Sequence, residues 1–458
     1  MDMFCRPSKT AIPIHAVSKA GLKKWLSRQS ATVKKWVTSS DFKADPGTHL
    51  TLAGKDGALA GVVLGVNANF DMWDYGGLAK TLPPGKYALT ADLGAEESTR
   101  AAIAFGLGVY QFTRYKSESE TIKVQLAWPK DCDQAAARQT VEAAALVRDL
   151  INHPAEDMGP SEMEAQFKAL ARKHKATVSV IKGNDLLKKN YPAIHAIGRA
   201  CDDAPRLLDM RWGRRTDPKI TLVGKGVCFD TGGLDIKTAA GMKTMKKDMG
   251  GAAHVLGVAH MLMAAKAPIR LRVMIPAVEN NIDGNAIRPL DVIKTRSGKT
   301  IEIGNTDAEG RVILSDALYE ASTEKPEFIL DFATLTGAAR VALGTELPAL
   351  FCSDDAWAER VLNAGKIEQD QLWRMPLWAP YKKLIRGKTA DITNAPDQPF
   401  GGAITAALFL QEFVGQSPWG HIDVMAWNQA AQPGRPEGGE AMGMRAVARA
   451  IQDWAKSA

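Results

Sequence analysis

Cysteine is scarce in this chain of 458 residues, and its five cysteines form no C-x-x-C pair. Such scattered thiols suggest a reducing compartment and argue against both a disulfide framework and a thiolate zinc site. The chain also lacks any run of about 18 apolar residues, so we expect no membrane-spanning segment. Its first residues lack the continuous apolar stretch of a signal peptide. These absences together predict a cytoplasmic protein.

Several ligand-binding motifs are missing as well. The pattern G-x-x-x-x-G-K-[ST] is absent and no G-x-G-x-x-G follows a predicted strand, which argues against a nucleotide site. The zinc-binding pattern H-E-x-x-H is also absent. His254 and His260 lie in a mostly apolar helical segment. We expect these two histidines to pack in the core or to contact the residues that bind metal, rather than to bind metal themselves.

Positive charge is unevenly placed along the chain. The net charge is +7, and residues 1–45 hold nine Lys or Arg against three Asp or Glu. A basic first segment is able to contact nucleic acid or another anionic surface. The simpler interpretation is a solvated helix face over residues 21–36. The sequence leaves both interpretations open.

The length of the chain favours two domains. Short apolar runs alternate with segments of helical spacing, which predicts an α/β fold. We expect a small N-terminal α/β domain at 1–132, a linker helix at 133–152 and a larger α/β domain at 153–458. Nearly continuous apolar strands in the larger domain predict a mixed central sheet flanked by helices. Ligands of such sheets gather at the carboxyl ends of the strands.

Charged residues appear where the apolar strands of the larger domain end. Lys225, Asp230 and Lys237 surround the glycine-rich turn of "TLVGKGVCFDTGGLDIK", and Asp248 precedes the Gly-Gly start of a helix. Taken singly, Asp248 is typical of a helix cap, and Lys225 of a solvent-exposed strand end. Taken together, they indicate a functional edge of the sheet.

The stretch "IGNTDAEGRVIL" places Asp307, Glu309 and Arg311 at alternate positions. In an extended segment these side chains leave the backbone on the same side. Neighbouring carboxylates repel each other unless a cation lies between them, and the candidates are Arg311, a metal ion or both. With Asp230 and Asp248, the two carboxylates would balance two divalent cations. Oxygen ligands without thiolates suit zinc, manganese or magnesium, so the residues favour a two-metal hydrolase.

Four motifs carry a family resemblance. They are GKGVCFDTGGLDIK (224–237), MKKDMGGAA (245–253), NTDAEGR (305–311) and ATLTGA (333–338). Together they resemble the leucyl aminopeptidase family, the dinuclear M17 type of cytosol aminopeptidase. The likeness covers roughly 150–458. It implies a metal-dependent leucyl-type aminopeptidase, a hydrolase that removes the N-terminal residue of peptides, with 153–458 as its catalytic dinuclear-metal domain.

The resemblance implies a role for each metal-site residue. Asp230 and Glu309 would bridge two divalent metal ions, Zn²⁺ or Mn²⁺. Asp307 would complete one metal site. Lys225 and Asp248 would complete the other, and Lys225 would bind as a neutral amine because an ammonium group has no lone pair.

Two further residues would act in catalysis. Lys237 would stay charged, polarise the scissile carbonyl and stabilise the charge that develops on it. Arg311 would hold a bicarbonate ion that serves as general base toward water. On this interpretation Asp307 and Glu309 face metal, and Arg311 faces the anion that takes the proton.

The resemblance also implies a substrate site. The carbonyl of Leu335 would receive the free α-amine of the peptide, and Met245, Thr334 and Gly337 would line the pocket for the first side chain. Such a pocket favours apolar, unbranched or γ-branched side chains. Plain core packing is the alternative for Met245.

The turn departs from the family pattern at Thr231, which keeps the expected hydroxyl, and at Asp235. The Asp235 carboxylate either faces solvent or shifts the preference toward basic or polar side chains.

The family assembles as homohexamers, which we carry over as an expectation. Two rival functions stay open: another two-metal hydrolase acting on amides or phosphate esters, and DNA binding by the basic residues 1–45. A requirement for a free α-amine would separate the peptidase from the first rival.

Overall fold

The computed structural model describes residues 3–54, 56–118 and 121–457. These residues form two compact units, one from Met1–Ala145 and Gln429–Glu437 and one from Leu146–Asn428 and Gly438–Ala458. Each unit has its own β-sheet and helices, so the predicted α/β class, with a small first and a larger second domain, is confirmed. The boundaries expected at 132 and 152 stay a prediction. None of the five cysteines forms a disulfide with another described residue.

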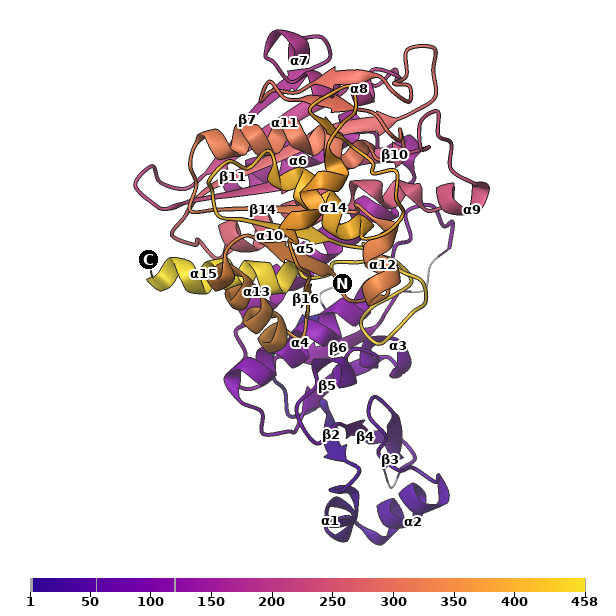
Figure 1. Cartoon of the computed structure of the whole chain (residues 1–458). Coiled ribbons are helices and arrows are strands. Elements are labelled where there is room, and N and C mark those ends of the chain that lie inside the picture. Colours follow the sequence, from indigo (N-terminus) through magenta and orange to yellow (C-terminus); the bar gives the residue numbers. More distant parts are fainter. Residues whose placement is uncertain (1–2, 55, 119–120, 458) are drawn as a thin grey trace. The chain divides into compact units, whose positions relative to one another are not determined.

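The first unit is built on a six-stranded sheet (Figure 1). In sheet order its strands are β1 Phe4–Cys5, β6 Val124–Ala127, β5 Gly85–Leu89, β2 Ile12–Ser18, β4 Leu59–Val66 and β3 His49–Ala53. Neighbouring strands are parallel except β3 and β4. The helices are α1 Leu22–Ser27, α2 Ala31–Ser39, η1 Met72–Tyr75, α3 Leu78–Thr81 and α4 Ala95–Val109. The basic stretch at 21–36 therefore lies on two short helices, α1 and α2.

The second unit is built on a nine-stranded mixed sheet. In sheet order its strands are β16 Trp373–Arg374, β15 Ala349–Cys352, β18 Trp419–Asp423, β14 Phe328–Ala333, β9 Lys219–Gly224, β11 Arg270–Asn280, β8 Arg206–Trp212 and β7 Thr177–Lys182, with β10 Gly226–Asp230 beside β11. The central strands β18, β14, β9 and β11 are parallel, whereas β15, β8 and β7 introduce antiparallel pairs. Two smaller sheets accompany it: β12 Val292–Lys294, β13 Thr300–Glu302 and β17 Ile392–Thr393, and the pair β19 Trp427–Asn428 and β20 Gly438–Gly439.

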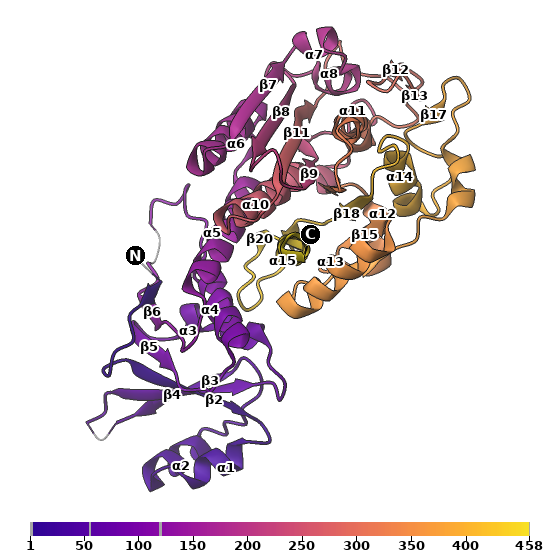
Figure 2. The same cartoon turned by 90° about the vertical axis from the view of Figure 1, so that its left-hand side faces the viewer.

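Helices cover both faces of the large sheet. Figure 2 shows α10 Gly250–Ala264 and α11 Glu309–Thr323 on opposite faces of β9. The other helices are η2 Ala155–Asp157, α6 Pro160–His174, α7 Asp185–Lys188, α8 Pro192–Gly198, α9 Ala239–Met242, η3 Met245–Met249, α12 Gly337–Leu343, α13 Asp355–Glu368, η4 Ala379–Ile385, α14 Gly402–Gln411 and α15 Met444–Ser457. Helix α5 Gln134–Asn152 begins in the first unit and ends in the second. Every residue of β14 and β18 is buried, which explains why these strands read as nearly continuous apolar runs.

The apolar run "KITLVGKGV" at 219–227 predicts a single strand, but the structure divides it at Lys225. Strand β9 pairs with β14 and β11, whereas β10 pairs with β11 alone. At the break, the Lys225 N–H donates to the Phe332 carbonyl of β14 at 3.0 Å, and its carbonyl accepts from the Ala252 N–H of α10 at 2.8 Å. The break costs no hydrogen bond of this residue and releases its side chain from the regular alternation of the strand.

A buried ion pair ties the start of the second unit to its end. The Arg148 guanidinium donates to the Glu440 carboxylate at 3.1 and 2.9 Å, and the side chains are 1% and 5% exposed. Glu440 also accepts from the Asn428 side-chain amide at 2.9 Å and from the Ala441 N–H at 2.8 Å. Hydrogen-bond donors of the protein therefore take the place of water around the buried carboxylate.

In the part of the chain that the structure describes, no helix is long and apolar enough to cross a bilayer.

Replacing Glu440 tests this buried pair. We expect Glu440→Gln to lower the free energy of unfolding by about 3–5 kcal/mol, because it leaves the Arg148 charge buried without a carboxylate. Urea unfolding followed by tryptophan fluorescence measures the change. The matched control is Asp453→Asn, which removes an exposed partner of Arg449 on α15 and should cost less than about 1 kcal/mol. Equal losses in the two variants would contradict the prediction.

Candidate metal and catalytic site

The predicted metal and catalytic residues lie on separate segments of the second unit. They are Lys225 at the β9–β10 junction, Asp230 at the end of β10, Lys237 after the glycine-rich turn, Asp248 in η3, Asp307 before α11, and Glu309 and Arg311 in the first turn of α11. The strands involved are parallel at this point, so their carboxyl ends meet at one edge of the sheet. The fold gathers six of these seven side chains into two ion-pair clusters.

The first cluster surrounds Lys225. Its ammonium group lies 2.7 Å from the Asp248 carboxylate and 2.8 Å from the Glu309 carboxylate. It also donates to the Thr334 carbonyl at 3.0 Å. The Thr334 hydroxyl in turn donates to Asp248 at 2.7 Å. Lys225, Asp248 and Glu309 are each at most 3% exposed, so this cluster is removed from water.

The second cluster surrounds Lys237. Its ammonium group lies 2.9 Å from the Asp230 carboxylate and also pairs with Asp307. Asp230 is buried, and its Oδ1 accepts from the Asn280 side-chain amide at 2.8 Å and the Gly232 N–H at 2.9 Å. Side chains at the rim are more open, with Lys237 15% and Asp307 31% exposed. This cluster is therefore the more solvent-accessible side of the candidate site.

Three carboxylates join the two clusters into a group suited to metal. Ligand oxygens of Asp230, Asp307 and Glu309 all lie within 4.8 Å of one another. Asp307 Oδ1 and Glu309 Oε1, with Asp248 Oδ2, are buried oxygens that accept no hydrogen bond from the described residues. Each contacts a lysine ammonium instead. Hard oxygen ligands oriented toward positive charge fit one or more divalent cations.

The electrostatics explain why this group demands cations. Burial, reinforced by the nearby Asp230 charge, raises the pKa of the Glu309 carboxyl well above its ordinary value. The same two causes raise the pKa of Asp307 to about 6. Burial alone would lower the pKa of Lys225, but the carboxylates of Asp248 and Glu309 outweigh it and raise that pKa. Carboxylates packed this closely together stay ionised only when positive charge lies beside them.

The segment 305–311 is not extended, so that part of the sequence interpretation is wrong. Residues 306 and 307 form a turn, and α11 begins at Glu309. The Asp307 N–H donates to the Asn305 side chain at 2.7 Å, which fixes the turn. Asp307 and Glu309 still converge, because ligand oxygens of the two side chains lie within 4.8 Å of each other.

Two single-residue interpretations are excluded. Asp248 does not cap α10: the residue before that helix is Met249, whose side chain makes no cap hydrogen bond. Lys225 is 3% exposed and is not a solvent-facing lysine. His254 and His260 are both buried, as expected of residues that pack in the core. His254 donates to the Gly250 carbonyl and accepts from the Met442 N–H, and burial lowers its pKa to about 4.

The glycine-rich turn needs its glycines, and Asp235 has a structural role in it. Gly232 and Gly233 adopt φ values of +90° and +66°, which disfavour side chains. The Asp235 carboxylate accepts from the Thr306 N–H at 2.7 Å. The Thr306 hydroxyl donates to the Gly232 carbonyl at 2.6 Å. These bonds connect the turn that carries Lys237 to the turn that carries Asp307.

Arg311 lies apart from both clusters. It is 8% exposed, and its Nη1 donates to the Asn394 carbonyl at 2.7 Å. Its Nε is buried and has no hydrogen-bond partner among the described residues. Burial lowers the pKa of Arg311 to about 10, so the guanidinium stays charged at neutral pH. A buried cation with an unsatisfied donor fits an anion.

The predicted substrate residues border the clusters. Thr334 contacts both Lys225 and Asp248, as described above. Leu335 follows it in the loop between β14 and α12, and Gly337 is the first residue of α12. Met245 opens η3, three residues before Asp248, and is 8% exposed. Its burial is compatible with both a pocket wall and core packing, so its role stays a prediction.

Sequence reasoning missed the amides that orient the site. Asn280 donates to both Asp230 and the Thr306 carbonyl, and Asn394 donates to the Asn305 and Ala308 carbonyls. Asn280 ends the apolar strand β11, so a polar residue at a strand's carboxyl end was the available signal. Asn394 follows the two-residue strand β17, for which the sequence offers no comparable signal.

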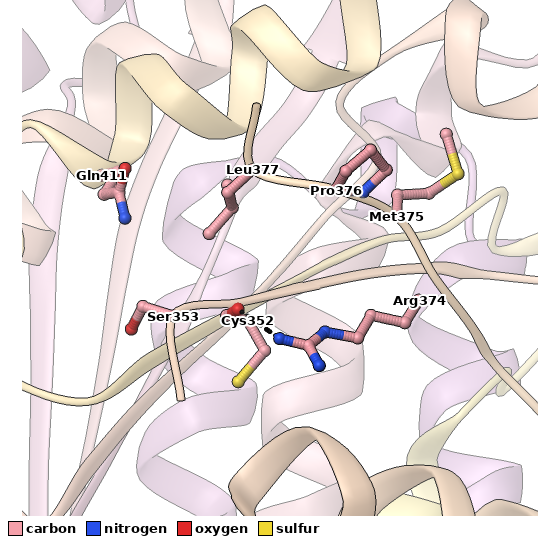
Figure 3. A pocket seen from close by; sticks show the side chains of 7 residues that line it. All are labelled: Cys352, Ser353, Arg374, Met375, Pro376, Leu377 and Gln411. Carbon is pink, nitrogen blue, oxygen red and sulfur yellow. Dashed lines mark hydrogen bonds between the residues drawn. The ribbon is translucent and has the colours of Figure 1, made fainter. Parts of the chain in front are cut away.

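A separate hollow of about 560 Å³ lies at the edge of the large sheet. Figure 3 shows its lining: Cys352, Ser353, Arg374, Met375, Pro376, Leu377 and Gln411. Arg374 donates to the Cys352 carbonyl and pairs with Asp355. Burial raises the pKa of the Cys352 thiol to about 11, so the thiol is protonated. The hollow contains none of the predicted site residues.

Models of known families match both parts of the chain. The model of the cytosol aminopeptidase family catalytic domain matches residues 145–448. The model of the M17 aminopeptidase N-terminal domain matches residues 12–129.

Similar proteins and structures agree with these matches. A "Probable cytosol aminopeptidase" of Rhodopseudomonas palustris is 40% identical over 433 residues, 88% of this chain and 86% of its own. One of Caulobacter vibrioides is 40% identical over 388 residues, 81% of this chain and 78% of its own. The crystal structure of the cytosol aminopeptidase from Coxiella burnetii has a TM-score of 0.95 and 49% identity, and the match covers 98% of both chains. The bottromycin maturation enzyme BotP in complex with Mn has a TM-score of 0.87 and 31% identity, covering 97% of this chain and 99% of that one.

Gly310 gives a test of the first cluster as a metal site. A β-carbon at this position would lie 2.5–2.7 Å from the end of the Lys225 side chain, which is held by three partners. We expect Gly310→Ala to weaken Mn²⁺ binding by about tenfold or more, measured by titration calorimetry, although alanine favours a helix. The control is Gly284→Ala, whose β-carbon would meet nothing within 4 Å. Unchanged Mn²⁺ affinity in Gly310→Ala would contradict this view of the cluster.

Proposed function

This chain belongs to the cytosol aminopeptidase family of peptidases, and we propose that it removes the N-terminal residue from peptides at the site formed around Lys225 and Lys237. The observation that carries the proposal is the gathering of the predicted ligands into one largely buried group. Carboxylate oxygens of Asp230, Asp307 and Glu309 lie within 4.8 Å of one another. Such a group would be strongly unfavourable without cations.

The donor set fits two divalent ions. We assign Asp230 and Glu309 as shared ligands, Asp307 to one ion, and Lys225 with Asp248 to the other. Zn²⁺ and Mn²⁺ both suit these ligands, and the similar enzyme BotP forms a complex with Mn. When bound, the ions would supply Lewis-acid polarisation of water and of the scissile carbonyl, and bicarbonate at Arg311 would supply a base.

The chain's own residues orient the reaction. Lys237 stays protonated because Asp230 and Asp307 raise its pKa against the effect of burial, so it donates a hydrogen bond to the carbonyl oxygen as charge develops there. Arg311 holds the anion through its buried Nε, while the Asn394 carbonyl fixes its other end. The amide of Asn280 keeps the Asp230 carboxylate in place.

The substrate enters with its free amine toward the loop after β14. We assign the Leu335 carbonyl to the α-amine, and Met245, Thr334 and Gly337 to the first side-chain pocket, which favours leucine-like residues. The Asp235 carboxylate is engaged by the Thr306 N–H, so we assign it to loop structure rather than to specificity. Assembly into a homohexamer and a cytoplasmic location complete the proposal.

Hydrolysis of leucine p-nitroanilide tests the proposed activity. We expect activity that is lost on dialysis against chelator, returns with Mn²⁺ or Zn²⁺, and is absent on the N-acetylated substrate. Replacing a supporting residue around a metal site typically costs 10–100-fold, so the ligand variant Glu309→Gln should lose about 100-fold or more.

The control is Glu302→Gln. Glu302 is 6% exposed and accepts from the Thr389 N–H, but it lies outside both clusters, so activity should be retained. Turnover of phosphate esters without any need for a free amine would instead favour another two-metal hydrolase.

DNA binding is a second proposal, carried by a basic cluster on α1 and α2. Its members are Lys23, Lys24, Arg28, Lys34 and Lys35. All five side chains are exposed, and none forms an ion pair within the described ranges. By contrast, Lys19 and Lys43 nearby pair with Asp45 and Asp41. Unpaired surface cations on adjacent helices suit a phosphate backbone.

Neutralising the basic cluster with glutamine tests DNA binding. We expect retention of duplex DNA to fall, and the slope of log K against log salt to shrink by about 0.9 for each phosphate that the protein no longer neutralises. Fluorescence anisotropy at several salt concentrations measures both. The control neutralises five exposed lysines of the second unit: Lys266, Lys294, Lys325, Lys366 and Lys383. If both sets of substitutions lower the DNA affinity equally, net charge alone explains the binding. That result would contradict a local binding surface on α1 and α2.

A further inference from the structure

Asp423, at the end of β18, holds the loop between β14 and α12. Its Oδ1 accepts from the Leu335 N–H at 3.0 Å and the Thr336 N–H at 3.2 Å. Its Oδ2 accepts from the Thr336 hydroxyl at 2.6 Å. Asp423 is 4% exposed, so these donors replace the water that a buried carboxylate requires. None of the sequence motifs that indicated the site includes this residue.

These hydrogen bonds determine which way one peptide group points. The peptide between Leu335 and Thr336 is planar and trans, so its C=O and N–H point in opposite directions. Because the Thr336 N–H points at Asp423, the Leu335 carbonyl points away from it. A flipped peptide would bring that carbonyl oxygen against the Asp423 carboxylate, where two acceptors would repel each other.

The same loop leaves one acceptor available. The Thr334 carbonyl accepts from Lys225 at 3.0 Å, and the Thr334 hydroxyl donates to Asp248. The Thr336 hydroxyl accepts from the Ala339 N–H at 3.0 Å as it caps α12. Across the residues that the structure describes, the Leu335 carbonyl accepts no hydrogen bond. Thr334 and Thr336 thus hold the loop on either side of Leu335, whose carbonyl is available to accept a hydrogen bond.

We propose that Asp423 is a positioning residue for substrate binding. By holding the Leu335–Thr336 peptide, it presents the Leu335 carbonyl to the N-terminal amine of the peptide substrate. This inference rests on the proposed function, which assigns that carbonyl to the amine. Asp423 itself touches neither the metal ligands nor the substrate. Its negative charge matters because only an acceptor-only side chain excludes the flipped peptide.

Asp423→Asn is the informative variant. Asparagine has the same shape, but its amide is able to donate to the flipped Leu335 carbonyl and so to stabilise the wrong orientation. We expect KM for leucine p-nitroanilide to rise by about 10- to 100-fold, which corresponds to the loss of one hydrogen bond to a charged group. The affinity for Mn²⁺ should be unchanged. The matched control is Asp370→Asn. Asp370 is also a buried carboxylate that accepts backbone N–H groups, from Gly443 and Arg445, but it lies outside the site.

A binding measurement separates positioning from a general loss of structure. Calorimetry compares L-leucine with 4-methylpentanoate, its analogue without the amine, on the Mn²⁺-loaded enzyme. The wild type and Asp370→Asn should share the same preference for leucine, and Asp423→Asn should lose about tenfold or more of it. An unchanged preference in Asp423→Asn would overturn the proposal.

Thr336 provides a second route if Asp423→Asn does not fold. Thr336→Ala removes the hydroxyl that donates to Oδ2 and should raise KM, whereas Thr336→Ser keeps the hydroxyl and should behave as wild type. Equal KM values for all three proteins would overturn the positioning role. A wild-type enzyme that hydrolyses no N-terminal residue from any peptide or anilide would instead refute the proposed function, so the two failures are distinguishable.

Discussion

The site of the second unit depends on holding four carboxylates, three of them buried, around two lysine side chains. Burial and mutual repulsion disfavour ionised carboxylates, and the raised pKa values of Asp307 and Glu309 reflect both. Without metal, the ammonium groups of Lys225 and Lys237 balance part of this charge. Divalent cations would balance the rest, and Lys225 would then have to be a neutral amine to bind one of them. A site of this kind holds together only if the surrounding backbone prevents the like charges from separating.

The sheet supplies that restraint through its irregular points. Dividing the expected strand at Lys225 places this side chain between η3 and α11 without losing backbone hydrogen bonds. Gly310 leaves space for the end of that lysine on α11. Thr306 and Asp235 tie together the two turns that carry Asp307 and Lys237. Each device is local, but together they fix carboxylates that originate nearly 80 positions apart in the chain.

A second layer of carboxylates orients backbone rather than metal. Asp423 directs the peptide after Leu335, and Asp370 accepts N–H groups at the start of α15. In both cases an ionised side chain is buried because it is surrounded by donors, which is the condition under which such burial is tolerated. The chain thus places aspartates both in the candidate metal site at the edge of the sheet and beside it, where they hold backbone N–H groups.

The α/β class and the two-part organisation could be predicted from the amino-acid sequence, because apolar periodicity is a local signal. Polar residues at strand ends are local signals too, and they indicated the charged residues of the candidate site, whose roles stay a prediction. Four short motifs also carried the family resemblance. The break at Lys225, the turn at 306–307 and the roles of Asn280 and Asp423 emerged only in the folded chain. Which partner a side chain contacts depends on the packing of strands that are distant in sequence. The sequence alone does not distinguish an aspartate that would bind metal from one that accepts hydrogen bonds from backbone N–H groups.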